Sequence, residues 1–185
     1  MKRVLLIAVN AKYIHSNPAV YSLKAYAQAA LEDLNVEIDI AEYTINQNTE
    51  NILADIYRRK PDIAAFSCYI WNWNTIQGLL PEIPKLLPET KLWLGGPEVS
   101  FHAEKILEQY SYLDGIMVGE GEQTFTELVR FYQTEEGSLL DIKGLVLPTG
   151  RTPVRELTDM NRLPFLYKDL ERFANRIIYY ESQRG

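Results

Sequence analysis

Apolar runs bounded by turn residues recur along this chain, with segments of helical spacing between them. The first, third and fifth runs are continuously apolar rather than alternating, which is typical of parallel strands that are covered on both faces. The predicted strands are residues 3–10, 36–44, 62–70, 91–96 and 115–121. Strands that alternate with helices imply right-handed crossovers, so we expect a doubly wound parallel sheet.

The segments between the runs carry helix signals of unequal quality. Asn17 is a candidate N-cap before Pro18, which suits the first position of a helix. A second helix is predicted for residues 49–60, after another asparagine and ending in three cations. Residues 74–88 contain a glycine and two internal prolines, so we expect a kinked or two-part helix there.

These elements favour an α/β, flavodoxin-like fold with a five-stranded sheet in the order 2-1-3-4-5. Two short extended runs within residues 142–156 predict an appended hairpin, and residues 157–167 read as a linker. We therefore divide the chain into a Rossmann-like domain, residues 1–140, and a hairpin, linker and tail, residues 141–185. In such a sheet, ligands bind in the crevice at the carboxyl ends of the strands, where the winding reverses.

The composition is that of an ordinary globular protein, with 46% hydrophobic and 24% charged residues in a length of 185. The net charge is −6, and the cations are scattered, which argues against nucleic acid as a partner. A single cysteine, Cys68, excludes internal disulfides and thiolate metal cages within these residues and fits a reducing, cytoplasmic location. The first apolar run, about six residues, is too short to span a membrane.

Several common cofactors are disfavoured by the turn after the first strand, "NAKYIHSNP". It lacks the glycines of a nicotinamide site, and no P-loop follows any strand. It also lacks the acidic residues that hold magnesium in phospho-receivers and the small residues of a flavin phosphate loop. Whatever the crevice binds, we expect it to be contacted mainly by the later turns.

Small residues end the fourth and fifth predicted strands. Gly95 and Gly96 lie in "LGGPEVSF", and Gly119 and Gly121 lie in "VGEGEQTF", where Thr124 is a candidate N-cap. Each motif alone is also compatible with a plain tight turn. Because adjacent strands end side by side, the two motifs together outline a crevice wall with room for a large planar ligand.

Aromatic residues follow the third strand, in "SCYIWNWN". Ser67 ends that strand, and the rings of Tyr69, Trp71 and Trp73 are suited either to covering a flat ligand or to core packing against the next helix. Cys68 is better explained as a small buried hydrophobe than as a nucleophile, because no partner base is identifiable.

The two histidines of the chain, His15 and His102, are isolated from other metal ligands in the sequence. The position of His15 in the first turn is compatible either with a ligand contact or with simple exposure to solvent.

With these motifs in hand, the chain resembles the N-terminal cobalamin-binding domain of cobalamin-dependent radical S-adenosylmethionine enzymes. "LGGPEVSF", "GIMVGEGEQTFTEL" and "MNRLPFLY" are similar to segments of that family. "YYESQRG" is similar to the strand that leads into its cysteine loop, where a four-iron cluster binds. The likeness covers nearly the whole chain, and it implies that the chain continues into a radical S-adenosylmethionine barrel whose first strand begins in residues 141–185.

The resemblance implies a corrin lying over the carboxyl ends of the strands, with its nucleotide tail in the crevice near strands one, three and four. Ser67 matches the family's serine, and Gly95 and Gly96 match the glycine pair that makes space for the tail, so valine at Gly96 should block the tail and spare the fold. The expected cofactor-binding residues are Asn10, Tyr13, His15, Ser67, Cys68, Tyr69, Gly95, Gly96, Pro97, Glu98, Gly119, Glu120, Gly121 and Thr124.

The resemblance implies that these residues alone perform no catalysis and ligate no metal. The iron-sulfur cluster and S-adenosylmethionine would belong to the downstream domain, and the parent enzyme would carry out methyl transfer or a related radical reaction. One departure stands out: the Asp-x-His-x-x-Gly motif that ligates cobalt in other cobalamin proteins is absent, and His15 lies in a different setting. This fits a group that binds cobalamin without a histidine ligand.

Two alternatives stay open from the residues themselves. A flavodoxin-like interaction or regulatory domain without a cofactor would have a collapsed crevice. A hydrolase would need Glu98, Glu120 and Glu122 to converge as acid and base, although helix capping or solvation explains these carboxylates more simply.

Overall fold

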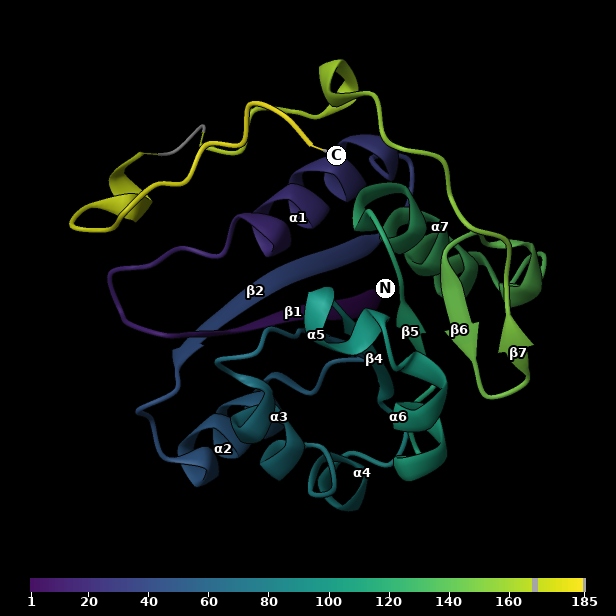
Figure 1. Cartoon of the computed structure of the whole chain (residues 1–185), viewed down its shortest axis with the longest axis horizontal. Helices are drawn as coiled ribbons and strands as arrows, with labels where there is room; N and C mark the ends of the chain where they lie inside the picture. Colours follow the sequence, from purple (N-terminus) through teal and green to yellow (C-terminus); the bar gives the residue numbers. More distant parts are fainter. Residues whose placement is uncertain (168–169, 185) are drawn as a thin grey trace.

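A seven-stranded sheet forms the centre of the protein. The computed structural model describes residues 1–167 and 170–184. The strands follow the order β2-β1-β3-β4-β5-β6-β7, and the first five are parallel, which confirms the predicted order (Figure 1). The strands are β1 (Lys2–Asn10), β2 (Val36–Thr44), β3 (Ile63–Ser67), β4 (Lys91–Gly95), β5 (Gly115–Met117), β6 (Leu145–Leu147) and β7 (Gly150–Arg151).

The predicted hairpin is β6 and β7, and it extends the sheet rather than lying apart from it. β6 pairs antiparallel with β5, and β7 pairs antiparallel with β6. Predicted strands three and five end earlier than expected, at Ser67 and Met117. After Ser67 the chain turns because the side chain of Asn72 accepts a hydrogen bond from Tyr69 N. After Met117 it turns at Gly119, where φ is +84°.

Seven α-helices lie between the strands in the described part of the chain. The expected break in the third helical segment is confirmed, because α3 ends before Pro81 and α4 begins around Pro84. A short helix, α5, follows β4 directly and was not predicted. The helices are α1 (Pro18–Ala30), α2 (Thr49–Arg59), α3 (Trp73–Leu79), α4 (Ile83–Leu86), α5 (Pro97–Ser100), α6 (Ala103–Gln109) and α7 (Gly121–Thr134). None of them, among the described residues, has the length and apolar character needed to cross a bilayer.

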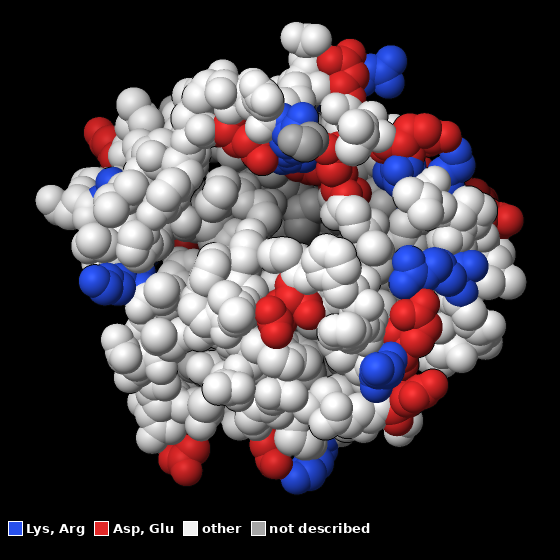
Figure 2. All heavy atoms as spheres, in the orientation of Figure 1, with Lys and Arg blue, Asp and Glu red and all other residues white. Residues whose placement is uncertain are grey.

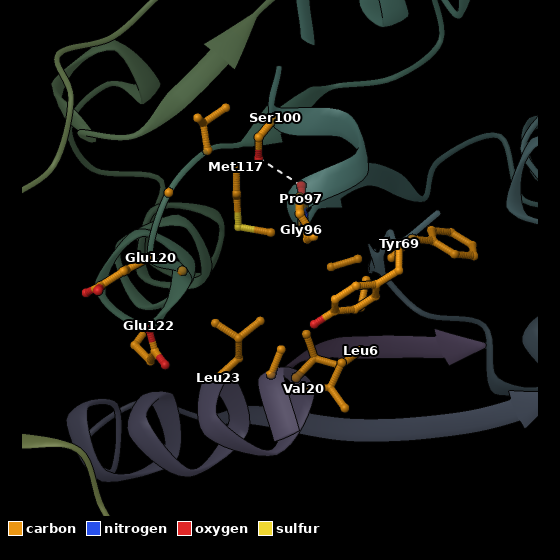
Figure 3. A pocket seen from close by; sticks show the side chains of 18 of the residues that line it. Leu6, Val20, Leu23, Tyr69, Gly96, Pro97, Ser100, Met117, Glu120 and Glu122 are labelled. Atoms are coloured by element: carbon orange, nitrogen blue, oxygen red, sulfur yellow. Dashed lines mark hydrogen bonds between the residues drawn. The ribbon is translucent and has the colours of Figure 1, made fainter. Parts of the chain in front are cut away.

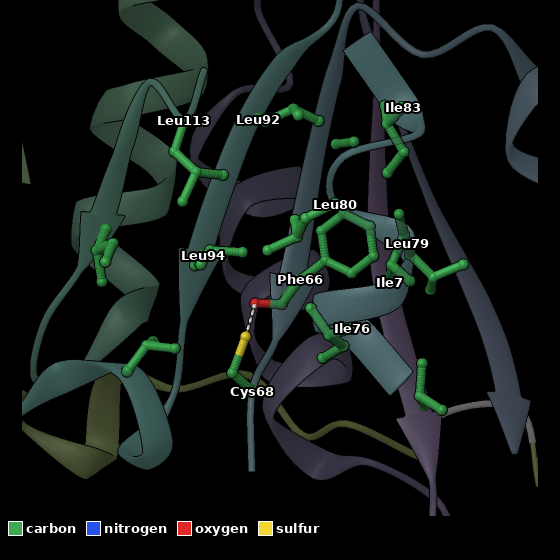
Figure 4. Packing of buried hydrophobic residues seen from close by; sticks show 14 of the residues in the cluster. Ile7, Phe66, Cys68, Ile76, Leu79, Leu80, Ile83, Leu92, Leu94 and Leu113 are labelled. Atoms are coloured by element: carbon green, nitrogen blue, oxygen red, sulfur yellow. Dashed lines mark hydrogen bonds between the residues drawn. The ribbon is translucent and has the colours of Figure 1, made fainter. Parts of the chain in front are cut away.

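The helices cover the two faces of the sheet in separate layers (Figure 1). One face packs against α2 to α6, and its cluster includes Phe66, Ile76 and Leu79 (Figure 4). The other face packs against α1 and α7 through residues such as Val20 and Phe125. β1 lies between the two layers, and each residue from Val4 to Val9 is at most 2% exposed, which explains its continuous apolar sequence.

The predicted N-caps have three different outcomes. Asn48 caps α2 by accepting a hydrogen bond from Glu50 N, as expected. Asn17 occupies the N-cap position of α1, but its side chain caps nothing and instead donates to Ser67 Oγ. The N-cap prediction for Thr124 is wrong, because α7 begins at Gly121; the Thr124 hydroxyl donates to the carbonyl of Lys143 on the neighbouring segment.

The C-terminal segment crosses the α1 side of the molecule (Figure 1). Tyr167 and Phe173 are buried there, and the ring of Phe173 meets that of Tyr21 edge to face. The extended residues that follow make a single parallel bridge, between Ile177 and His15, rather than a strand ladder. The view that this segment is the first strand of a further domain stays a prediction.

Candidate functional site: a slot at the carboxyl edge of the sheet

A cavity of about 680 Å³ opens where β1, β3, β4 and β5 approach their carboxyl ends. It lies on the face of the sheet covered by α1 and α7, and Figure 2 shows it as a hollow with charged side chains along its upper rim. Leu6, Val20, Leu23, Tyr69 and Met117 point into it from four different elements (Figure 3). We call this cavity the slot. The collapsed crevice expected for an interaction domain without a cofactor is therefore not what the chain forms.

Eight of the predicted residues line the slot: Ser67, Tyr69, Gly95, Gly96, Pro97, Gly119, Glu120 and Gly121. They come from the carboxyl ends of β3 and β4 and from the segments that directly follow β3, β4 and β5, as the sequence predicts. The other lining residues are Leu6, Pro18, Ala19, Val20, Leu23, Ala65, Phe66, Ser100, Phe101, Met117, Val118, Glu122, Arg151, Glu181 and Arg184.

The two consecutive glycines at the end of β4 have different roles. A Cβ on Gly95 would meet its nearest neighbour, the Met117 side chain, at 3.7 Å, which is ordinary van der Waals contact. Gly95 is therefore not required by the backbone, and its missing side chain leaves the floor of the slot open. Gly96 has φ of +107°, and a Cβ there would lie 2.4 Å from the carbonyl oxygen of Cys68. The expectation that valine at Gly96 would spare the fold is wrong, because the backbone itself demands glycine.

The residues after β3 divide between the slot and the core. Tyr69 lines the slot, and its ring stacks on that of the half-exposed Trp71 with centroids 4.4 Å apart. Trp73 instead packs against Tyr110 on the opposite face. Buried Asn72 holds this turn in place by donating to the carbonyls of Val9 and Ser67, which ties the ends of β1 and β3 together.

The Tyr69 hydroxyl is a proton donor held at the slot. Burial raises the pKa of Tyr69, and a hydrogen bond with Ser67 opposes this rise only in part, so the phenol stays protonated. Nearby, Ser67 Oγ accepts a hydrogen bond from Asn17 Nδ2 at 3.2 Å. Asn17 Oδ1 is buried and has no partner among the described residues, so an acceptor is left unsatisfied beside the slot.

The two acidic residues of "GEGE" are already engaged by the C-terminal segment. Glu120 accepts a hydrogen bond from Thr158 N at 2.5 Å. Glu122 accepts two from Arg184, at 2.8 and 3.1 Å, and one from Ser22 Oγ at 2.6 Å. Burial alone would raise the pKa of Glu122, but the hydrogen bonds from Arg184 and Ser22 outweigh it and hold the pKa below its usual value.

These contacts argue against the hydrolase alternative, which needs the carboxylates of Glu98, Glu120 and Glu122 to converge. Glu122 is ionised and paired, Glu120 holds a backbone amide, and Glu98 does not line the slot. The three side chains therefore do not form an acid and base pair around one cavity.

Six predicted residues lie outside the slot: Asn10, Tyr13, His15, Cys68, Glu98 and Thr124. Cys68 is fully buried, and burial raises the pKa of its thiol, so it is the inert core residue that the sequence favours. His15 is hydrogen-bonded to the Tyr179 hydroxyl, and Asn10 donates to Glu42 and to the carbonyl of His15. Their contacts are thus with the rest of the chain.

Sequence reasoning missed the α1 wall and the C-terminal contribution to the slot. Val20 and Leu23 belong to the apolar stripe of α1, and nothing local distinguishes a residue that faces a cavity from one that faces the core. Arg184 lies 62 residues from Glu122, and only its place in the "SQRG" motif marked it.

The fold and site together define a doubly wound α/β domain with a ligand slot at the switch of its winding. A sequence model described as the B12 binding domain matches residues 4–129, so the chain belongs to this family. Cobalamin, the cofactor predicted from the sequence, is the one that defines the family.

Two relatives of the chain are named as methyltransferases. It is 27% identical over 95 residues to the cobalamin-dependent radical SAM methyltransferase TokK of Streptomyces tokunonensis, across 51% of this chain and 14% of TokK. It is 32% identical over 69 residues to the 2-(S-pantetheinyl)-carbapenam-3-carboxylate methyltransferase of Streptantibioticus cattleyicolor, across 37% of this chain and 10% of that protein. The matches therefore span about a tenth to a seventh of these relatives.

Solved structures share the fold. The radical enzyme OxsB, with aqua-cobalamin and S-adenosylmethionine bound, matches with a TM-score of 0.76 and 19% identity, across 94% of this chain and 25% of OxsB. TsrM from Kitasatospora setae, with cobalamin and a four-iron cluster bound, matches with a TM-score of 0.66 and 21% identity, across 88% of this chain and 30% of TsrM. These likenesses establish the architecture, and the family match establishes the cofactor class.

The residues present fit the nucleotide tail of cobalamin. Its flat aromatic base needs an apolar slot, and the volume of about 680 Å³ lies in the usual range for ligand sites, about 300–1,000 Å³. Its polar groups need hydrogen-bond partners, which the Tyr69 hydroxyl and Ser67 Oγ offer from the lining of the slot. At the mouth, Phe101 is 84% exposed, an apolar surface suited to a flat ring system.

Proposed function

We propose that this chain is the cobalamin-binding part of a radical S-adenosylmethionine enzyme and that its slot receives the nucleotide tail of cobalamin. The observation that carries the proposal is the slot itself, open at the carboxyl edge of a sheet whose sequence belongs to the B12-binding family. Gly95 and Ala65 keep its floor free of large side chains, while Leu6 and Val20 make its wall apolar.

The residues of the chain have a binding role in this proposal, not a catalytic one. Tyr69 donates a hydrogen bond into the slot, Ser67 provides a polar partner at its edge, and Val20 and Met117 exclude water from it. The bound cobalamin would supply the group-carrying chemistry of its cobalt. None of the expected binding residues outside the slot is needed for this arrangement.

The activity of the whole protein is proposed from its relatives. Both curated relatives are named as methyltransferases, and each is much longer than the matched segment. We infer that this domain works beside a downstream radical S-adenosylmethionine barrel of the same chain, which would hold the iron-sulfur cluster and S-adenosylmethionine, in methyl transfer or a related radical reaction. A cytoplasmic location, where thiols stay reduced, would suit the cysteine ligands of such a cluster.

Retention of cobalamin by the chain tests the proposal. The purified protein is mixed with hydroxocobalamin and desalted, and the corrin absorption is compared with the protein concentration. We expect near-stoichiometric retention. Folded protein that elutes without corrin colour at high concentration would favour an interaction domain without a cofactor.

A matched pair of leucine variants makes the test specific to the slot. Gly95→Leu places a side chain on the slot floor, whereas Gly78→Leu adds the same side chain to a position of α3 where a Cβ meets nothing within 4 Å. We expect Gly95→Leu to lose cobalamin and keep a cooperative melting transition, and Gly78→Leu to retain both. Equal retention by the two variants would show that the tail binds elsewhere.

A further inference from the structure

The Glu122 carboxylate joins three parts of the molecule at the edge of the slot. It lies at the start of α7, it accepts a hydrogen bond from Ser22 of α1 at 2.6 Å, and it is held by the guanidinium of Arg184 through two hydrogen bonds. Only 4% of the Glu122 side chain and 18% of the Arg184 side chain are exposed. This ion pair is therefore far more enclosed than an ordinary surface salt bridge.

Glu122 lies where α1 and α7, the two helices that flank the slot, pack closely against each other. A Cβ on Gly121 would lie 2.9 Å from Leu23 Cδ2, so α1 and α7 nearly touch at this point. The adjacent pair, Ser22 and Glu122, is hydrogen-bonded. Arg184 thus binds at the place where both helix walls meet, and Figure 3 shows Leu23 and Glu122 close to each other at the side of the slot.

Residues 177–184, which we call the strap, are fixed at their other end as well. Ser16 Oγ donates to the carbonyl of Ile177 at 2.9 Å, and Ile177 N donates to the carbonyl of Ile14 at 2.7 Å. Just before the strap, Arg176 forms an ion pair with Glu42. Between these ends Glu181 lines the slot, as does Arg184. The strap therefore runs along the edge of the slot with an anchor at each of its ends.

We propose that Glu122 and Arg184 are positioning residues that close the strap over the slot, so that closure of the strap and retention of cobalamin are energetically coupled. The inference rests on the proposed function of the slot. It assigns a joint role to the second carboxylate of "GEGE" and the arginine of "SQRG", because the two side chains are paired with each other.

The chemistry of the pair supports this role. The planar guanidinium of Arg184 matches the carboxylate with two parallel hydrogen bonds, which fixes orientation as well as distance, and lysine cannot reproduce this fork. Loss of Arg184 would leave the Glu122 charge enclosed without a counter-ion, and the strap would lose its anchor on the α7 side. The slot would then be open to solvent along the edge that the strap covers.

Two measurements on the full 185-residue chain test the coupling. The first is the dissociation rate of bound cobalamin, followed by absorption after transfer into cobalamin-free buffer with a scavenging binder. The second is cleavage by trypsin after Arg176, located by mass spectrometry, which reports opening because this side chain is only 16% exposed and engaged with Glu42. The variants are Arg184→Gln, Arg184→Lys and Glu122→Gln, with exposed Arg162→Gln as the control.

We expect Arg184→Gln and Glu122→Gln to speed cobalamin dissociation about tenfold, within the usual range of coupling between sites. Both should also speed cleavage after Arg176, while Arg184→Lys recovers part of the loss and Arg162→Gln changes neither rate. Because Arg184 lies at an outer segment, its variants test the coupling even if Glu122→Gln fails to fold.

Two outcomes would overturn the inference in distinguishable ways. If the wild type retains cobalamin and the Arg184 variants match it in both rates, the strap is not coupled to the slot, although the proposed function stands. If the wild type retains no cobalamin, the proposed function fails and the coupling fails with it, whatever the cleavage rates show.

Discussion

The two faces of the sheet are covered to different degrees, and the difference locates function. The face against α2 to α6 is filled to the end of the strands, with Phe66, Leu79 and Leu94 each at most 2% exposed. The face against α1 and α7 is filled near the amino ends of the strands but opens into the slot at their carboxyl ends. The packed face provides stability, and the incomplete packing of the other face provides a binding site.

Consecutive residues of β4 and its turn show the same contrast on a smaller scale. Gly96 turns toward the carbonyl of Cys68 on the packed side and is needed by the backbone, whereas Gly95 faces the slot and is needed for space. The presence of a glycine does not by itself distinguish the two roles. The sign of φ and the distance from a Cβ at that position to the nearest atoms distinguish them.

The largest effect is expected at Gly96. Gly96→Ala adds a strained φ and a Cβ at 2.4 Å from a backbone oxygen, so the free energy of unfolding should fall by about 3 kcal/mol or more. Gly95→Ala should change it by less than about 1 kcal/mol. Chemical denaturation followed by circular dichroism measures both. Equal losses would mean that the two glycines share one role.

A core truncation on the packed face should cost stability without changing the slot. Leu79 is fully buried, so Leu79→Ala should lower the free energy of unfolding by about 3 kcal/mol. The affinity of the remaining folded protein for cobalamin should stay unchanged, because Leu79 lies on the opposite face of the sheet. Denaturation and an absorption titration at low temperature test the two parts; a matching loss of affinity would show that the faces are not independent.

The ion pair between Glu122 and Arg184 should make the free energy of unfolding fall at acid pH. The pKa of Glu122 is lower in the folded chain than in the unfolded chain, so the unfolded state takes up more protons as the pH falls. The pair's contribution, about 2 kcal/mol, is present above the ordinary glutamate pKa of about 4.3 and is lost as the pH falls through the lower folded value. Denaturation of wild type and Glu122→Gln between neutral and acid pH should converge at the acid end, and a constant difference would contradict this.

The smallest effect is expected at Tyr69. Tyr69→Phe removes the hydroxyl that points into the slot and keeps the ring that stacks on Trp71. Affinity for cobalamin should fall by about 1 kcal/mol, roughly fivefold, with little change in melting temperature. Tyr57→Phe, at an exposed position of α2, is the matched control. An unchanged Kd for Tyr69→Phe would place the polar part of the ligand away from this hydroxyl.

The sequence predicts the sheet well, because strand burial leaves a local record. The continuous apolar run of β1 and the alternation along the edge strand β2 follow from how many faces each strand covers. The slot is predicted at the strand ends that glycines and Ser67 mark and in the motifs around them, which include Tyr69, Pro97 and Glu120. Its α1 wall, the split between Gly95 and Gly96, and the pairing of Glu122 with Arg184 depend on contacts between distant residues, which no local pattern encodes. Thr124 misled for a related reason: its hydroxyl serves a neighbouring segment rather than its own helix.

Binding of cobalamin in the slot can be followed most directly at Met117, whose side chain points into the slot (Figure 3). The chain has three methionines, so methyl-labelled protein gives internal controls at Met1 and Met160, neither of which lines the slot. On addition of hydroxocobalamin, the methyl resonance of Met117 should shift strongly, while those of Met1 and Met160 stay in place. Bound corrin with an unmoved Met117 resonance would contradict a nucleotide tail in the slot.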